Sequence, residues 1–113
     1  MKKKQIIQKE KEFTEIIHKC PYKKNNYFVI YYRKNKEQNR FGISVPKKTG
    51  KAHIRNKIKR RIKNIIDQNE KRVQTPFDYV IIIRKRLIEL DYNGIANNLL
   101  SLINRIGEKN KNE

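Results

Sequence analysis

A run of cationic side chains between residues 47 and 63 is the part of this sequence whose residue types best suit a specific chemistry. Nine of these seventeen residues are Lys or Arg, and none is Asp or Glu. Arg can hold a phosphate through two parallel hydrogen bonds, whereas Lys supplies a mobile point charge. Asn56 and Asn64 add neutral hydrogen-bonding groups that suit sugars and base edges. The run therefore predicts a surface that binds nucleic acid.

The charge balance of the whole chain supports this interpretation. Its 113 residues include 29 Lys and Arg against 11 Asp and Glu, which gives a formal net charge of +18. The simpler alternative is the solvated face of an amphipathic helix, but such a face normally mixes both signs. Between Glu37 and Asp67, ten basic residues occur without a single acid. A membrane is disfavoured as the partner, because no stretch approaches the roughly 18 apolar residues of a membrane span.

Patterns typical of protein catalysis or metal binding are absent from the sequence. There is no paired-carboxylate constellation and no nucleophile with a base at recognisable spacing, and His18 and His53 are the only histidines. Cys20 is the single cysteine, so we expect neither an internal disulfide nor a disulfide-linked partner. The start of the chain lacks the apolar region of a signal peptide. We expect a cytoplasmic protein without catalytic residues or an organic cofactor of its own.

Hydrophobic periodicity predicts the elements that position the basic run. The run itself belongs to a helix whose buried stripe is formed by isoleucines, with Arg55, Lys59 and Arg61 flanking that stripe. The predicted stripe consists of Ile54, Ile58, Ile62, Ile65 and Ile66. Asp91 is the expected N-cap of a last helix.

The remaining elements surround this basic helix along the chain. Apolar residues at helical spacing predict a short helix over 10–20, and β-rich runs predict strands over 27–33, 40–45 and 77–85. We expect the second strand to run antiparallel to its neighbour and residues 107–113 to form a disordered tail. The order helix, strands, helix, strand, helix indicates a single α+β domain over 1–113, a sandwich of helices on a small sheet.

The elements also indicate which nucleic acid is bound. A helix-turn-helix that reads DNA needs a second helix just before the basic one, but here a strand and a Gly-containing loop precede it. Aromatic residues on the first helix and first strand favour unpaired RNA, whose bases stack on such rings. Aromatic residues of a sheet are nevertheless more often part of the core. These residues are Phe13, Tyr27, Phe28, Tyr31 and Tyr32.

Three segments together resemble the protein component of bacterial ribonuclease P: FGISVPK, then KKTGKAHIRNKIKRRIK, then DYVIIIRK. The resemblance extends from the helix that contains EFTEII to the final helix. It implies a left-handed crossover around the basic helix. It also implies that a separate RNA subunit performs the Mg²⁺-dependent removal of the 5′ leader from precursor tRNA, with the protein inactive alone. Mg²⁺ would then act mainly at the RNA, and any metal site on the protein is left open.

The resemblance further assigns residues to the two expected RNA contacts. The single-stranded leader would lie in a cleft between the first helix and the sheet, lined by Phe13, Ile17 and Tyr31. Two residues depart from the family pattern: Lys57 replaces an Arg, and Ile17 stands where a second aromatic is frequent. The surface for the RNA subunit would comprise Lys47, Lys48, Lys51, Arg55, Asn56, Lys57, Lys59, Arg60 and Lys63.

Two other functions remain open at this point. A ribosomal protein with a structural role on rRNA shares the small size and the basic charge. A stand-alone nuclease is the weaker alternative, because it would need clustered acidic ligands for a metal.

Overall fold

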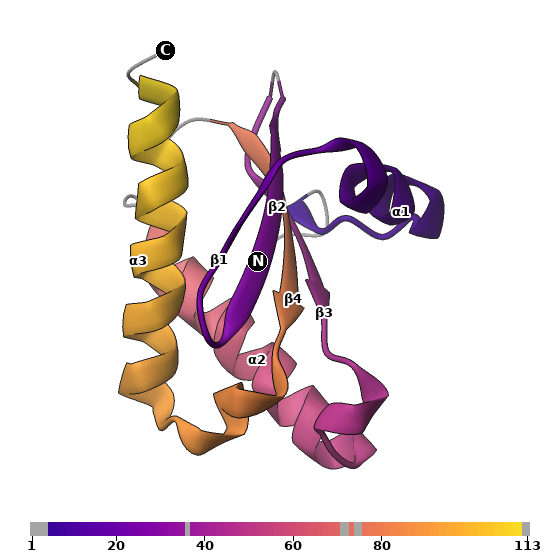
Figure 1. The fold of residues 1–113 in the computed structure, drawn as a ribbon, viewed down its shortest axis with the longest axis vertical. Helices are drawn as coiled ribbons and strands as arrows, with labels where there is room; N and C mark the ends of the chain where they lie inside the picture. Colours follow the sequence, from indigo (N-terminus) through magenta and orange to yellow (C-terminus); the bar gives the residue numbers. More distant parts are fainter. Residues whose placement is uncertain (1–4, 36, 71–72, 74–75, 112–113) are drawn as a thin grey trace.

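A four-stranded mixed sheet forms the centre of the computed structural model, which describes residues 5–35, 37–70, 73 and 76–111 (Figure 1). Helix α1 lies on one side of the sheet, and α2 and α3 lie on the other (Figure 1). This arrangement confirms the predicted α+β domain. In chain order the elements are α1 (Glu10–Lys19), β1 (Tyr22–Lys24), β2 (Phe28–Lys34), β3 (Arg40–Ser44), η2 (Lys47–Thr49), α2 (Ala52–Gln68), β4 (Phe77–Ile83), η4 (Lys85–Glu89) and α3 (Tyr92–Lys111), where η denotes a short 3-10 helix.

The strand order in the sheet is β1-β2-β4-β3. Strand β2 pairs antiparallel with both β1 and β4, whereas β3 pairs parallel with β4. The prediction that β3 runs antiparallel to its neighbour was therefore wrong. Its neighbour is β4, and α2 returns the chain to the end of the sheet at which β3 began, so that β4 runs in the same direction as β3. This β3-α2-β4 connection is a crossover; its left-handed sense remains an expectation from the resemblance.

The two faces of the sheet carry different residues because side chains alternate along a strand. Phe28, Ile30 and Tyr32 of β2 face α2 and α3 and belong to the main core. Alternate residues of β4 join them, and Phe41 stacks on Tyr79 with ring centroids 5.3 Å apart. The opposite face turns toward α1 and is only partly covered, because α1 has ten residues. An incompletely covered sheet face results.

Several local predictions need correction. The edge strand β1 was not predicted, since two of its three residues are lysines. Ile54 was placed in the buried stripe, but it is 36% exposed, because the first turn of α2 lies against the loop at Gly50 rather than over the core. Helix α3 continues to Lys111, beyond the expected start of a disordered tail at residue 107; residues 112–113 lie outside the described part.

The start of α3 follows the sequence prediction. The Asp91 carboxylate accepts a hydrogen bond of 2.8 Å from the backbone N–H of Gly94. This contact satisfies one of the free N–H groups at a helix start, as expected for an N-cap. Among the described residues, no helix combines the length and the apolar character needed to cross a membrane.

Candidate nucleic-acid interface

The basic run occupies η2 and the outer side of α2. Ile58, Ile62 and Ile65 anchor α2 in the main core, so the positions between them turn outward. Every residue assigned to the RNA subunit is exposed or half-buried, and none belongs to the core. We call this set the basic surface: Lys47, Lys48, Lys51, Arg55, Asn56, Lys57, Lys59, Arg60 and Lys63.

The loop before α2 is fixed to the first turn of the helix. The Arg55 side chain donates from Nε to the carbonyl oxygen of Gly50 at 3.2 Å. The backbone N–H groups of Ile54 and Arg55 both donate to the carbonyl of Lys51 at 3.0 Å. These contacts fasten the backbone of the loop that follows η2 to the first turn of α2. The loop and the helix therefore present one continuous surface.

The electrostatics of the α2 start also favour an anion. The first turn contains no acidic residue, and the residue preceding the helix, Lys51, makes no side-chain cap. Backbone N–H groups and the positive end of the helix dipole thus lie beside Lys47, Lys48 and Lys51. Phosphate oxygens are the groups that such a combination attracts.

The residues assigned to the leader cleft meet on the other side of the sheet, between α1 and the strands. Phe13 and Ile17 of α1 and Tyr31 of β2 are all half-buried. They pack against a small buried group of three residues that is separate from the main core. We call the whole assembly the α1 cluster: Ile7, Ile16 and Val80, which are buried, with Phe13, Ile17, Cys20, Tyr31 and Ile82 around them.

A glycine on β3 brings Phe13 close to the sheet. A Cβ atom added at Gly42 would lie 2.7 Å from Cε2 of the Phe13 ring, so the ring occupies the space that any other residue would fill. Gly42 is the register partner of Val80, which in turn pairs with Tyr31. Phe13 therefore lies over the same row of the sheet as Tyr31.

A small pocket lies between the α1 cluster and the basic surface. Its volume is about 180 Å³, and its wall includes Phe13 together with Lys59 and Lys63 of α2. The remaining lining residues are Ile6, Ile7, Phe41 and Ile43. Apolar walls with two cations at the rim suit a nucleotide, which has a flat base and an anionic phosphate. The pocket thus brings together residues that the sequence assigned to two separate contacts.

An ionic network that sequence reasoning missed fastens α1 to the strands. Asp78, only 1% exposed, lies on β4 between its register partners Arg33 on β2 and Arg40 on β3. Arg33 donates from Nε at 2.9 Å, and Arg40 donates from Nε and Nη2 at 2.8 Å each. The same Nη2 of Arg40 donates to Glu12 of α1 at 2.8 Å. The one sign of this network in the sequence was Asp78, an acidic residue inside the otherwise apolar run 77–83.

This network sets the charge of Asp78. Burial alone would raise the pKa of Asp78, but hydrogen bonds from Arg40, Arg33 and Asn35 outweigh burial and hold that pKa below its usual value. The same contacts raise the pKa of Arg40, mainly through its bonds to Asp78 and Glu12. Both groups are therefore charged at neutral pH.

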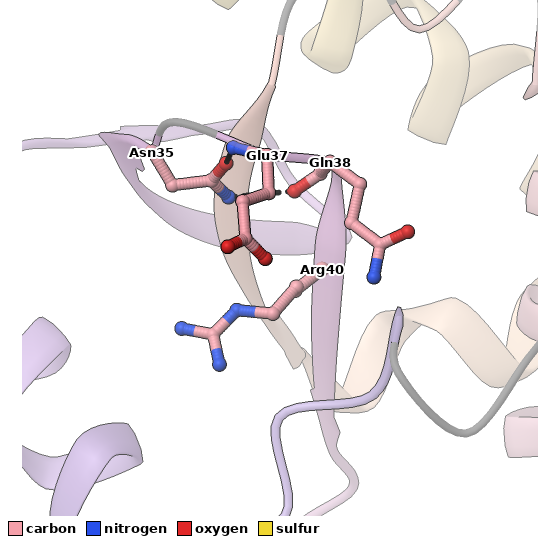
Figure 2. A pocket seen from close by; sticks show the side chains of 4 residues that line it. All are labelled: Asn35, Glu37, Gln38 and Arg40. Atoms are coloured by element: carbon pink, nitrogen blue, oxygen red, sulfur yellow. Dashed lines mark hydrogen bonds between the residues drawn. The ribbon is translucent and has the colours of Figure 1, made fainter.

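A further pocket lined by polar residues lies beside Arg40, at the turn between β2 and β3. Its volume is about 270 Å³, and Figure 2 shows the four residues that line it: Asn35, Glu37, Gln38 and Arg40. Asn35 fixes the turn by accepting a hydrogen bond from the Glu37 backbone N–H at 3.0 Å and donating to the Gln38 carbonyl at 2.7 Å. Because Arg40 is already engaged with Asp78 and Glu12, we assign no ligand to this pocket.

Comparison with known proteins places these features in a family. A family model described as Ribonuclease P matches residues 1–107. The "Ribonuclease P protein component" of Mycoplasma capricolum is 45% identical over 108 residues, which cover 94% of this chain and 99% of that protein. The protein of the same name from Bacillus cereus strain G9842 is 37% identical over 111 residues, covering 96% of each chain.

Solved structures show the same fold. A Staphylococcus aureus RNase P protein mutant, described as defective in mRNA degradation activity, superposes with a TM-score of 0.86 at 32% identity. The superposition covers 94% of this chain and 90% of that one. The RNase P protein from Thermotoga maritima superposes with a TM-score of 0.81 at 33% identity, covering 88% of this chain and 94% of that one.

Proposed function

Because this chain belongs to the ribonuclease P protein family, we propose that its basic surface binds the RNA subunit of ribonuclease P, while its α1 cluster holds the 5′ leader of precursor tRNA. Proteins of this name are subunits of a ribonucleoprotein endoribonuclease of tRNA processing, and the family match extends that role to this chain. The matches give no support to the ribosomal alternative.

One observation supports the proposal that the RNA subunit and the leader bind to two adjoining surfaces of this protein. The pocket between Phe13 and the Lys59 and Lys63 side chains connects the half-buried apolar surface to the cationic one. A base can be held on the apolar side while its phosphate remains beside a lysine. An unpaired strand that leaves α2 can therefore pass onto the sheet through this pocket, whose described lining residues include no acid.

We assign the Mg²⁺-dependent hydrolysis to the RNA subunit, in a complex that we place in the cytoplasm. The donor set of the protein supports this division of roles. The described residues contain no group of three or more His, Cys, Asp or Glu side chains arranged to hold a metal ion. Asp78, the buried acid of β4, has both carboxylate oxygens occupied by Arg33 and Arg40. The side chains of this chain bind and orient RNA.

Reconstitution with a bacterial ribonuclease P RNA tests the proposal. At low Mg²⁺, we expect correct 5′ cleavage of precursor tRNA only when protein and RNA are combined. Arg60→Ala should weaken assembly and reduce the slope of log affinity against log salt by about one, because one phosphate contact is lost. The matched control is Arg105→Ala, which removes the same charge from an exposed position on α3.

The leader contact is tested separately in the assembled complex. Phe13→Ala and Tyr31→Ala should weaken binding of precursor tRNA and leave binding of mature tRNA unchanged, since mature tRNA has no leader. Equal losses on both substrates would contradict the leader assignment. Failure of the wild-type protein to stimulate a cognate RNA would contradict the proposed function as a whole.

A further inference from the structure

The edge strand β1 exposes an aromatic side chain that neither predicted RNA contact includes. Tyr22 is 51% exposed, and it is the one aromatic among the exposed large hydrophobic residues in the described part of the chain. Figure 1 shows β1 at the border of the sheet, beside β2. The Tyr22 ring is therefore available for contact with a ligand.

The register of the sheet places Tyr22 in line with the α1 cluster. Tyr22 on β1 is opposite Tyr31 on β2, which is opposite Val80 on β4, which is opposite Gly42 on β3. The Phe13 ring lies against Gly42. Neighbouring strands are about 4.8 Å apart, so the row from β1 to β3 spans about 14 Å across the sheet. Three aromatic rings therefore mark one line perpendicular to the strands.

The pairing of Tyr22 with Tyr31 keeps both rings on the side of the sheet that α1 partly covers. The backbone N–H of Tyr32 donates to the Pro21 carbonyl at 3.1 Å, which makes Tyr22 and Tyr31 a non-hydrogen-bonded pair. Side chains of such pairs lie close together, and the two ring centroids are 5.2 Å apart at an interplanar angle of 50°. The Tyr31 ring packs against the Tyr22 ring, and the Tyr22 ring remains half-exposed.

The surroundings of Tyr22 attract anions. Lys19 precedes Tyr22 in the chain, Lys23 and Lys24 follow it directly on β1, and no acid occurs in the sequence between Glu15 and Glu37. Lys24 is two residues after Tyr22 on the same strand, so both side chains project from the same face. Lys24 is exposed. A flat ring with a cation at this spacing matches the base and the phosphate of one nucleotide.

We propose that Tyr22 is a stacking platform for an unpaired nucleotide of the precursor leader, with Lys24 as the partner of its phosphate. This inference rests on the proposed function and extends the leader path from the α1 cluster to the border of the sheet. The leader then crosses the strands, over Phe13 and Tyr31 first and over Tyr22 last. Tyr22 supplies an aromatic surface in a chain whose α1 carries Ile17 rather than a second ring.

Replacing Tyr22 in the reconstituted complex tests this inference. Tyr22→Leu keeps an apolar cover on Tyr31 but removes the ring, whereas Tyr22→Phe keeps the ring as the matched control. Tyr22→Leu should lower the affinity for precursor tRNA with a long single-stranded leader by about five- to tenfold, the low end for loss of one base–aromatic stack. Affinity for mature tRNA should not change, and Tyr22→Phe should bind as the wild type does.

A fluorescent leader separates direct stacking from an indirect effect through Tyr31. Leaders carry 2-aminopurine, whose fluorescence falls on stacking, at successive positions. We expect a position that is quenched by the wild type and by Tyr22→Phe, but not by Tyr22→Leu. This position should lie farther from the cleavage site than the one that depends on Tyr31.

Two results would overturn the inference and leave the proposed function intact. In one, Tyr22→Leu binds the long leader as tightly as the wild type does, while Phe13→Ala still weakens binding. In the other, Tyr22→Leu weakens mature tRNA equally, which would indicate a merely structural role. A third result would contradict the leader assignment itself. If the Phe13, Tyr31 and Tyr22 variants all bind precursor tRNA as tightly as the wild type does, both the leader assignment and this inference are wrong.

Discussion

The carboxylate of Asp78 offers the most direct test of how the strands and α1 are held together. Arg33 and Arg40 donate to it from both sides, and Asn35 adds a hydrogen bond of 2.8 Å to Oδ1. Replacement by Asn keeps the size of the side chain but removes its negative charge and one acceptor oxygen. Two guanidinium groups then face each other across β4 without the buried carboxylate between them, and keep the partly exposed Glu12 and Glu15 of α1 as their ion-pair partners.

The cost follows from the burial of the three groups. Removing one partner of a buried ion pair costs about 3–5 kcal/mol when the other charge stays buried. The side chains of Arg33 and Arg40 are 32% and 28% exposed, so water can solvate them in part. We therefore expect Asp78→Asn to lower the free energy of unfolding by about 3 kcal/mol. At about 4 °C per kcal/mol for a chain of this size, Tm should fall by about 12 °C.

Urea unfolding followed by circular dichroism, at neutral pH and a fixed sulfate concentration, measures this difference. Glu89→Gln is the matched control, because it raises the net charge equally and removes a carboxylate from an exposed pair with Arg86 at 3.9 Å. That control should change the free energy of unfolding by less than about 0.5 kcal/mol. If the two variants unfold at the same urea concentration, Asp78 is not the anchor that we describe.

Two further predictions concern the same region. Gly42→Ala should lower the free energy of unfolding by about 1–3 kcal/mol, because the new methyl group overlaps the Phe13 ring. A urea midpoint equal to that of the wild type would mean that the Phe13 ring can adopt another position without cost. The second prediction concerns acid. Since the pKa of Asp78 is depressed in the folded state, its stabilisation is present above its unfolded pKa and is lost as pH falls through the folded value. The stability gap between the wild type and Asp78→Asn should therefore be constant down to about pH 5 and shrink below about pH 4, whereas a gap independent of pH would contradict the assigned charge.

The helices of this protein could be predicted from the sequence because their apolar residues recur at the helical period. The isoleucines of α2 at positions 58, 62, 65 and 66 are buried as predicted. Ile54 fits the same period but is exposed, because periodicity identifies a face of the helix and not how far the core extends along it. The length of α3 was underestimated for a related reason, since its polar last turns carry no apolar signal.

The sheet was predicted less well because its pairing depends on distant segments. A run such as 40–45 reads as a strand whichever partner it finds, so its parallel pairing with β4 could not be derived locally. The basic run 47–63 was visible in the sequence itself, whereas the cleft residues Phe13, Ile17 and Tyr31 were assigned by family resemblance. The network around Asp78 joins residues up to 45 positions apart in the chain, and only the fold brings them together.

The position of β4 has a consequence for the order in which the protein assembles during synthesis. Strand β4 lies between β2 and β3, yet it leaves the ribosome after them and after the whole of α2. Until β4 arrives, β2 and β3 have no shared partner, and the isoleucines of α2 have an incomplete sheet to cover. The pairing of β3 with β4 closes a loop that contains the strongly cationic helix α2. The entropy cost of closing this loop is offset only after the contacts between β3 and β4 have formed. The nascent chain thus exposes the basic surface on α2 before its hydrophobic core is complete.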